Sequence, residues 1–388
     1  MVLKEKKIEI AEDFLEAIHH FLNSEKYSEA SSMVIESLDS LEEADPIQLG
    51  YGSAFLTLLE RFDSKKLKKR EWSWICFGKG NIYFINGNFD DALEEFEKML
   101  EISEEVGVRK EIAWGLRGVG RVQMQMGEME LAQKNFEKSL EISEGLKDRE
   151  TIASVCQNLG WLFGRKRDWR MAALYTERAL RLFEEINFER GSNEVYNNLG
   201  IIYYNKKEFD RAIEYYKKSI KISEKTRNKY VLANVSVNLA EVYLEVEEFE
   251  KAIESSKNGL NLFKETADII GVGEAYHIFS KIYAKQEKWK EALKHCKRSI
   301  KIFERHNTLY ELARGLKNLG LIEIELNRRK DALKAFEKSH EIFKKIYGHR
   351  GFTFKKIYQE YLGYAERIKK YAFDCAQFLN AAIKKGKN

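Results

Sequence analysis

The chain contains 388 residues, of which 33% are charged and 12% are aromatic, and its formal net charge is +4. This length exceeds the ~250–300 residues at which a single hydrophobic core stops growing, so we expect several domains or an extended repeat array. The single proline argues against an all-β protein, which would need many more turn residues. Four cysteines far apart indicate neither a disulfide framework nor a zinc cluster, and we expect no metal ion and no cofactor.

The sequence also bears on the compartment. Its apolar runs are all shorter than the ~18 residues that a membrane span requires. The N-terminus carries acidic residues where a signal peptide would have an apolar segment. We therefore expect a soluble, reduced, cytoplasmic protein that does not contact a membrane.

Residues 1–69 do not follow the repeat pattern described below. The spacing of their apolar residues predicts helices at 8–22, at 27–43 and at about 47–62, the last of which begins after Pro46, a residue suited to a first helical turn. Residues 63–70 form a basic linker. We interpret this segment as an N-terminal cap or a small three-helix domain.

A 40-residue repeat occupies residues 70–349 in seven copies. Alanine recurs every 40 residues, and a small residue precedes each of the first seven alanines by twelve positions. Apolar residues spaced by three and four predict two amphipathic helices per repeat, and the small residues let the helix axes approach. Gly107, Asn187 and Asn307 suit the left-handed turns between repeats. The alanines are Ala92, Ala132, Ala172, Ala212, Ala252, Ala292, Ala332 and Ala372, and the small residues are Gly80, Gly120, Gly160, Gly200, Ala240, Ser280 and Gly320.

Residues 350–388 are predicted to form a degenerate eighth repeat and a basic C-terminal cap. Between residues 342 and 388 there are eleven Lys or Arg residues and three acidic ones. Such an end could attract an acidic partner or nucleic acid, or it could simply keep the end of the array soluble.

The repeat resembles the tetratricopeptide repeat (TPR). Its fourth copy, SNEVYNNLGIIYYNKKEFDRAIEYYKKSIKIS, is similar to the TPR consensus almost throughout, and the resemblance covers roughly residues 70–345. The repeat is longer than the common form of about 34 residues. In this it resembles the long-helix arrays of Pins-like scaffolds and of Rap-like and MalT-like regulators. The resemblance implies an all-α fold, a right-handed superhelical α-solenoid of helical hairpins, in which the first helix of each repeat lines a concave groove.

The same resemblance assigns candidate partner-binding residues to the first helices. Trp and Arg are enriched at binding hot spots, and Arg can pair with a carboxylate through two hydrogen bonds. We therefore expect a protein or peptide partner with apolar anchors and acidic residues, and we expect Arg117 and Arg121 to be exposed. Farther along, Glu241 and Glu245 are expected to repel further acid. Alternatively, the tryptophans pack between repeats and the asparagines serve the fold. The candidates are Trp74, Phe77, Asn81, Trp114, Arg117, Arg121, Asn158, Trp161, Arg165, Asn197, Asn198, Tyr204 and Asn238.

The sequence shows no catalytic motif, and Cys76, Cys156 and Cys296 fall in predicted core positions. We expect a non-enzymatic protein–protein interaction scaffold that binds a peptide or helical segment in the groove. One alternative is a Rap-like, peptide-sensing regulator of a response regulator. The glutamine that assists phosphoryl hydrolysis in that family corresponds to Gly52 here, with Gln48 one turn earlier. A second alternative is an adaptor that binds nucleic acid through its basic C-terminal end, although Tyr and Phe at the spacings found there are more often core residues.

Overall fold

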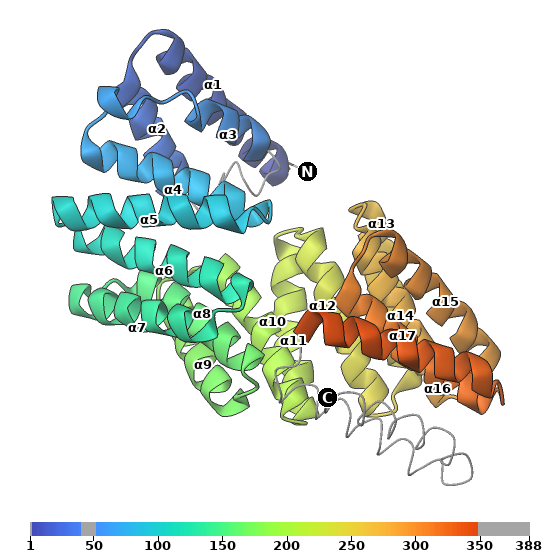
Figure 1. Ribbon diagram of the computed structural model, residues 1–388. Coiled ribbons are helices and arrows are strands. Elements are labelled where there is room, and N and C mark those ends of the chain that lie inside the picture. Colours follow the sequence, from blue (N-terminus) through green and yellow to red (C-terminus); the bar gives the residue numbers. More distant parts are fainter. Residues whose placement is uncertain (1, 40–51, 348–388) are drawn as a thin grey trace, which may run out of the picture. The chain divides into compact units, whose positions relative to one another are not determined.

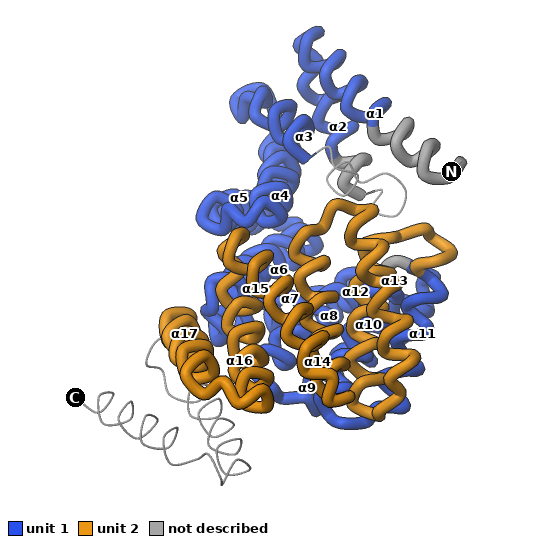
Figure 2. The backbone as a smooth tube through the Cα atoms, turned by 90° about the vertical axis from the view of Figure 1, so that its right-hand side faces the viewer, with its two compact units in different colours: residues 1–222 blue, residues 223–388 orange. Residues whose placement is uncertain are grey.

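The protein is built from helices alone over the part of the chain that the structure describes. The computed structural model describes residues 2–39 and 52–347, and these ranges hold seventeen α-helices, one short 3-10 helix (Ser64–Lys66) and no strand (Figure 1). The expected all-α class is therefore confirmed. The chain divides into two compact units, unit 1 at residues 1–222 and unit 2 at residues 223–388 (Figure 2).

Fourteen of these helices form seven consecutive hairpins, one for each predicted repeat, as a TPR solenoid requires. Within unit 1 each helix from α4 to α10 packs against the next, and within unit 2 the same holds from α12 to α17. The helices of unit 1 are α4 (Lys69–Ile85) and α5 (Phe89–Val106) in repeat 1, α6 (Arg109–Met126) and α7 (Met129–Leu146) in repeat 2, α8 (Arg149–Arg165) and α9 (Trp169–Glu185) in repeat 3, and α10 (Glu189–Asn205) and α11 (Phe209–Lys225), which crosses the boundary, in repeat 4. Unit 2 holds α12 (Lys229–Glu245) and α13 (Phe249–Glu265) in repeat 5, α14 (Ile269–Lys285) and α15 (Trp289–Arg305) in repeat 6, and α16 (Leu309–Glu325) and α17 (Arg329–Tyr347) in repeat 7.

Three helices precede the repeats: α1 (Val2–Asn23), α2 (Tyr27–Asp39) and α3 (Gly52–Leu59). The predicted helix 8–22 lies within α1. The predicted helices 27–43 and 47–62 contain α2 and α3, and their remaining parts fall partly outside the described residues. Both α2 and α3 pack against α4. Whether this segment acts as a cap or as an effector domain stays a prediction, and the predicted eighth repeat at 350–388 lies outside the described residues.

A residue with a left-handed backbone follows each helix from α4 to α16. Positive φ values recur every twenty residues from Gly87 to Asn327. The predicted turn residues Gly107, Asn187 and Asn307 have φ values of 77°, 56° and 53°. Their role in ending helices is confirmed, and it explains why the array needs no proline between its repeats.

The small-residue positions are contact points between the two helices of a hairpin. A Cβ atom added to Gly200 would lie 2.4 Å from the ring of Tyr216, which is closer than packed atoms can approach. Repeat 5 has Ala240 and Ser256 at the same two positions, so a larger residue on one helix accompanies a smaller one on the other. The predicted packing role is confirmed, because the seven described alanines of the series are at most 3% exposed. Cys76, Cys156 and Cys296 are likewise buried, as predicted.

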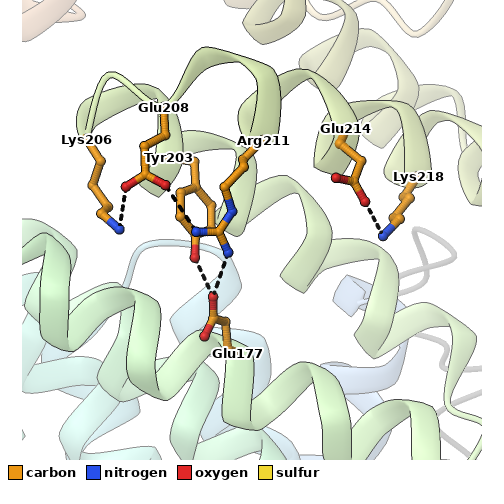
Figure 3. Close-up of polar contacts among 7 residues, drawn as sticks. All are labelled: Glu177, Tyr203, Lys206, Glu208, Arg211, Glu214 and Lys218. Carbon is orange, nitrogen blue, oxygen red and sulfur yellow. Dashed lines mark hydrogen bonds and ion pairs between the residues drawn. The ribbon is translucent and has the colours of Figure 1, made fainter.

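Polar contacts also join successive repeats, as at the junction of repeats 3 and 4 (Figure 3). The hydroxyl group of Tyr203 on α10 donates a hydrogen bond to Glu177 on α9. The guanidinium group of Arg211 on α11 lies 3.8 Å from the centre of the Tyr203 ring, and its Nη2 lies 3.4 Å from Glu177 Oε1. Burial, together with the hydrogen bond to Glu177, raises the pKa of Tyr203. This network holds α9, α10 and α11 together.

Candidate partner-binding site

Twelve of the thirteen predicted site residues lie on the first helices of repeats 1–4, in unit 1. Their helices α4, α6, α8 and α10 form a continuous series, because each also contacts the next first helix. We call the side of this series that carries the predicted residues the first-helix face. Asn238 lies on α12, in unit 2, and so belongs to the other compact unit.

The three aromatic residues of repeats 1 and 2 form a joint between these repeats. Trp74 and Phe77 are buried, and the ring of Trp114 contacts both, at centroid distances of 5.1 and 5.8 Å. The indole nitrogen of Trp114 donates to Thr151 Oγ1 at 2.8 Å. The expectation that Trp74 and Phe77 face a ligand is therefore wrong, because the neighbouring repeat covers them. Their packing matches the structural alternative.

Sequence reasoning missed the residue that fixes Trp74. Glu111 on α6 is buried, and its carboxylate accepts hydrogen bonds from Trp74 Nε1 at 3.2 Å, Ser73 Oγ at 3.2 Å and Arg70 Nε at 2.7 Å. These donors satisfy a charge that would otherwise be costly to bury. The sequence offered one indication of this role: Glu111 is a carboxylate at the position where repeat 3 has Thr151.

Arg117 and Arg121 are half-buried, so the expectation that both are exposed is wrong. Arg117 Nε is sealed from solvent and has no hydrogen-bond partner. Arg121 donates to Asn81 Oδ1 at 3.1 Å, and its guanidinium group lies 4.2 Å from the centre of the Phe84 ring. Burial lowers the pKa of Arg117, and burial with the charge of Arg117 lowers the pKa of Arg121 to about 9. Two desolvated positive charges therefore lie close to one another on this face.

The remaining predicted residues differ in their exposure to solvent and in their contacts within the protein. Arg165 is exposed and donates to the carbonyl oxygen of Met124 at 3.0 Å. Asn158 is half-buried, and its Nδ2 is sealed without a hydrogen-bond partner. The ring of Tyr204 contacts Phe209 at a centroid distance of 6.1 Å. Asn197, Asn198 and Asn238 are half-buried.

Apolar side chains are exposed on repeats 3 and 4 of this face. Trp161 on α8 is 51% exposed and Ile201, at the same position of α10, is 37% exposed. Trp161 lies seven positions farther along its helix than Trp74 and Trp114 do along theirs. That register separates the exposed tryptophan from the two in the joint. Trp161 and Ile201 can therefore offer a partner apolar area without unpacking the fold.

The first helices of unit 2 have a different electrostatic character, because their charges pair internally. Lys281 on α14 pairs with Glu241 on α12, and Arg314 on α16 pairs with Glu274 on α14 at 3.3 Å. The charge of Glu241 is thereby compensated, so the expectation that it repels an acidic ligand is wrong. Burial opposes the charge of Arg314, but Glu274 and other acids outweigh it and raise the pKa of Arg314.

Residues 2–39 and 52–347 contain neither a cluster of metal-ligating side chains nor a membrane-spanning helix. Within these ranges no three His, Cys, Asp or Glu side chains lie together as they would around a metal ion. In the same ranges, each helix is too short or too polar to cross a membrane.

The family follows from the repeats. Models of the tetratricopeptide repeat match residues 111–185, 192–265 and 272–345, and a further TPR model matches residues 73–105. These matches cover more than half of the 388 residues. The chain therefore belongs to the tetratricopeptide repeat family.

Solved structures share its fold. The chain is similar to a TPR-sensor signal-transduction ATPase from Pyrococcus horikoshii, with a TM-score of 0.63, 19% identity, and coverage of 87% of this chain and 53% of that one. It is also similar to aspartyl phosphate phosphatase F from Bacillus subtilis, with a TM-score of 0.60, 14% identity, and coverage of 86% and 94%. A Rap conjugation gene regulator of the plasmid pLS20, solved with the Phr* peptide, gives a TM-score of 0.57, 13% identity, and coverage of 88% and 97%.

The curated proteins that match are adenylosuccinate synthetases. The enzyme from Brachyspira hyodysenteriae is 44% identical over 45 residues, and that from Carboxydothermus hydrogenoformans is 49% identical over 43 residues. The chain spans 10% of the length of these curated relatives. A match of about one repeat in length gives no basis for an enzymatic activity.

Proposed function

We propose that this protein is a non-enzymatic interaction scaffold that binds a peptide or helical segment on the first-helix face of unit 1. The observation that carries the proposal is the exposure of Trp161 and Ile201 at the same position of neighbouring first helices. Both lie on the face that also holds Arg117, Arg121 and Arg165. The partner would place apolar anchors against Trp161 and Ile201 and direct acidic groups toward the arginines.

The energetics favour repeats 2–4 over the rest of the face. Trp74 and Phe77 are already buried between repeats, so a partner gains no area from them. Burying exposed apolar surface is worth about 25 cal/mol per Å², and a large aromatic residue at the centre of an interface is a frequent hot spot. The half-buried arginines add charge-assisted hydrogen bonds that select an acidic partner over a neutral one. Repeats with internally paired charges offer no such gain.

The similarity in fold to a regulator solved with a peptide supports peptide binding in general, but not a particular binding position. The regulator solved with the Phr* peptide covers 88% of this chain, and at 13% identity the shared feature is the fold. A helical array of this type presents the same succession of first helices to a ligand. The residues of this chain therefore decide where a ligand would lie on it.

The test compares matched variants in peptide binding. A displayed peptide library is selected on the immobilised full chain, and the enriched peptides are titrated against Trp161→Ala/Ile201→Ala and against Leu131→Ala/Leu174→Ala. Leu131 and Leu174 are apolar residues at least as exposed as Trp161 and Ile201, but they lie on the second helices α7 and α9. We expect enriched peptides to combine apolar and acidic residues, and only the first double variant to lose binding. Equal binding by the two double variants would place the ligand elsewhere.

A second candidate is a Rap-like regulator that acts on a response regulator. The similarity to aspartyl phosphate phosphatase F covers 86% of the chain, which is more than the repeats of residues 70–349 make up by themselves. The shared fold therefore extends beyond the repeats of residues 70–349. Of the two positions at issue, Gly52 begins α3 and Gln48 lies outside the described residues. A phosphatase assay on phosphorylated response regulators decides: dephosphorylation that Gln48→Ala abolishes would establish this function.

A further inference from the structure

The first-helix face contains two basic groups that lack the anionic partner their surroundings call for. No hydrogen bond or ion pair joins the guanidinium group of Arg117 to any described residue, and its Nε is sealed from solvent. Arg121 contacts an amide oxygen of Asn81 and the ring of Phe84, both uncharged. Both side chains are half-buried, and neither guanidinium group is paired with a carboxylate, which is an unfavourable state for a charged group.

Nearby acidic residues do not compensate the positive charges of Arg117 and Arg121. Glu150 and Asp148 raise the pKa of Arg117 less than burial lowers it. Asp148 pairs with Lys110 at 3.6 Å and caps α8 through the backbone nitrogen of Thr151. Glu194, the acid that acts on Arg121, accepts a hydrogen bond from Gln157 at 3.1 Å.

In unit 2, basic residues on the first helices are paired with carboxylates of neighbouring first helices. Lys281 occupies the position of its repeat that Arg121 occupies in repeat 2, and it pairs with Glu241. Arg314 is likewise half-buried and pairs with Glu274 at 3.3 Å. The first helices of the chain can therefore neutralise their own cations, and at Arg117 and Arg121 they do not.

We propose that Arg117 and Arg121 form a binding site for one dianionic oxyanion, a phosphoryl group, presented by the ligand of the first-helix face. Two guanidinium groups carry a charge of +2, which a single carboxylate would compensate only by half. A phosphoryl group carries a charge of about −1.5 to −2 near pH 7 and offers acceptor oxygens in three directions. It would place acceptor oxygens against both guanidinium groups at once. Asn158 Nδ2, a sealed donor on the adjacent first helix, is a further group without an acceptor.

The surroundings hold the side chain of Arg121 in position for such a group. The contact with Asn81 and the stacking on Phe84 fix the guanidinium plane of Arg121, which reduces the entropy lost on binding. The aromatic joint of Trp74, Phe77 and Trp114 provides apolar surroundings on the repeat 1 side, where charge-assisted hydrogen bonds are stronger than in water.

The inference rests on the proposed function only for the molecule that bears the phosphoryl group. The site itself is tested on the full chain with inorganic phosphate, sulfate and acetate at constant ionic strength, by calorimetric titration and by the shift in unfolding temperature. We expect phosphate and sulfate to bind and to raise the unfolding temperature, and acetate and chloride to do neither. Arg117→Gln and Arg121→Gln should each weaken phosphate binding at least about tenfold, the factor that corresponds to ~1.4 kcal/mol. Lys281→Gln, the matched control in unit 2, should bind phosphate normally.

Two further measurements separate this site from a structural role of the arginines. In phosphate-free buffer, Arg117→Gln should leave the unfolding temperature unchanged or raise it, because it removes a desolvated charge that has no partner. Between about pH 8 and about pH 5.5, phosphate affinity should fall as phosphate takes up its second proton, whereas sulfate affinity should not. A loss of stability in Arg117→Gln, an absence of phosphate binding, or equal binding of acetate would each overturn the proposal.

The bearer of the group is then identified with a library-selected peptide in which one acidic residue is replaced by phosphoserine. Binding at least about tenfold tighter than that of the serine form, lost in Arg121→Gln, supports a phosphorylated partner. Equal binding of the two forms, combined with phosphate binding by the free protein, assigns the site to free phosphate instead. Because the phosphate titrations use no peptide, failure of this inference is distinguishable from failure of the proposed function, which depends on Trp161 and Ile201.

Discussion

Replacing Gly200 by alanine tests the packing rule of the array most sharply. The new Cβ atom would lie 2.4–2.7 Å from three atoms of the Tyr216 ring, whereas ordinary contacts begin at 3.4 Å. Helix or ring must therefore move by about 1 Å in a close-packed interior. Overpacking of this kind costs about 1–3 kcal/mol, and with Tyr216 fully buried we expect the upper end of that range. Alanine also favours a helix over glycine by ~1 kcal/mol, so the net loss should be about 2 kcal/mol.

A double-mutant cycle with Tyr216→Ser identifies the cause. The combination Gly200→Ala/Tyr216→Ser imitates the natural pair Ala240 and Ser256 of repeat 5. Once the ring is gone, the added methyl group has room, and Gly200→Ala should stabilise the protein by about 1 kcal/mol through helix propensity alone. The two backgrounds should thus differ by about 3 kcal/mol, which is within the range of couplings between contacting residues.

The assay is urea denaturation followed by circular dichroism, with Gly164→Ala as the control. Gly164 lies within α8, and the nearest atom to its added Cβ, in Trp169, is at an ordinary 3.8 Å. This control should stabilise the protein by about 0.5–1 kcal/mol. The reasoning is refuted if Gly200→Ala is as stabilising as Gly164→Ala, or if its effect is the same with tyrosine and with serine at position 216.

Three other perturbations probe the turns, a buried imidazole and the alanine series. Ala267 has a φ of 55°, so Ala267→Gly should stabilise by about 0.5–1 kcal/mol in urea denaturation, whereas Gly127→Ala, at a φ of 88°, should destabilise. Burial, with nearby positive charges, lowers the pKa of His277 well below 6.5. The unfolded state therefore binds a proton that the folded state does not, so stability is full above about pH 6.5 and declines below it, and His277→Leu should flatten that decline in calorimetric scans. Ala212→Trp should cost about 1–3 kcal/mol or more, and hydrogen exchange should speed up in repeats 3 and 5 as well as in repeat 4; unchanged exchange in these neighbours would contradict coupling between repeats.

The repeat architecture could be predicted because the packing of the helices restricts the residue type at individual positions of each repeat. The two helices of a hairpin contact each other at Gly200, so this position requires a small residue. The same requirement recurs every 40 residues, and this periodicity is visible in the sequence. The turns are visible for a similar reason, since Gly107 and Asn187 suit a left-handed backbone. Local chemistry fixes both features.

The state of the site residues could not be predicted, because it depends on what the next repeat contributes. Trp74 is buried, and Glu111 of the following repeat accepts a hydrogen bond from its indole nitrogen, whereas Trp161, seven positions farther along its helix, stays exposed. Glu241 was expected to repel an acidic ligand, but Lys281, 40 residues later, compensates its charge. Such contacts can be predicted only when equivalent positions of successive repeats are considered as possible neighbours.

Hydrogen exchange of the full chain with and without a library-selected peptide tests the central claim most directly. Binding on the first-helix face should protect the backbone amides of α6, α8 and α10, around Arg121, Trp161 and Ile201, and should leave the second helices α7 and α9 unchanged. Protection confined to α1–α3, or to the second helices, would contradict a partner-binding site on the first-helix face.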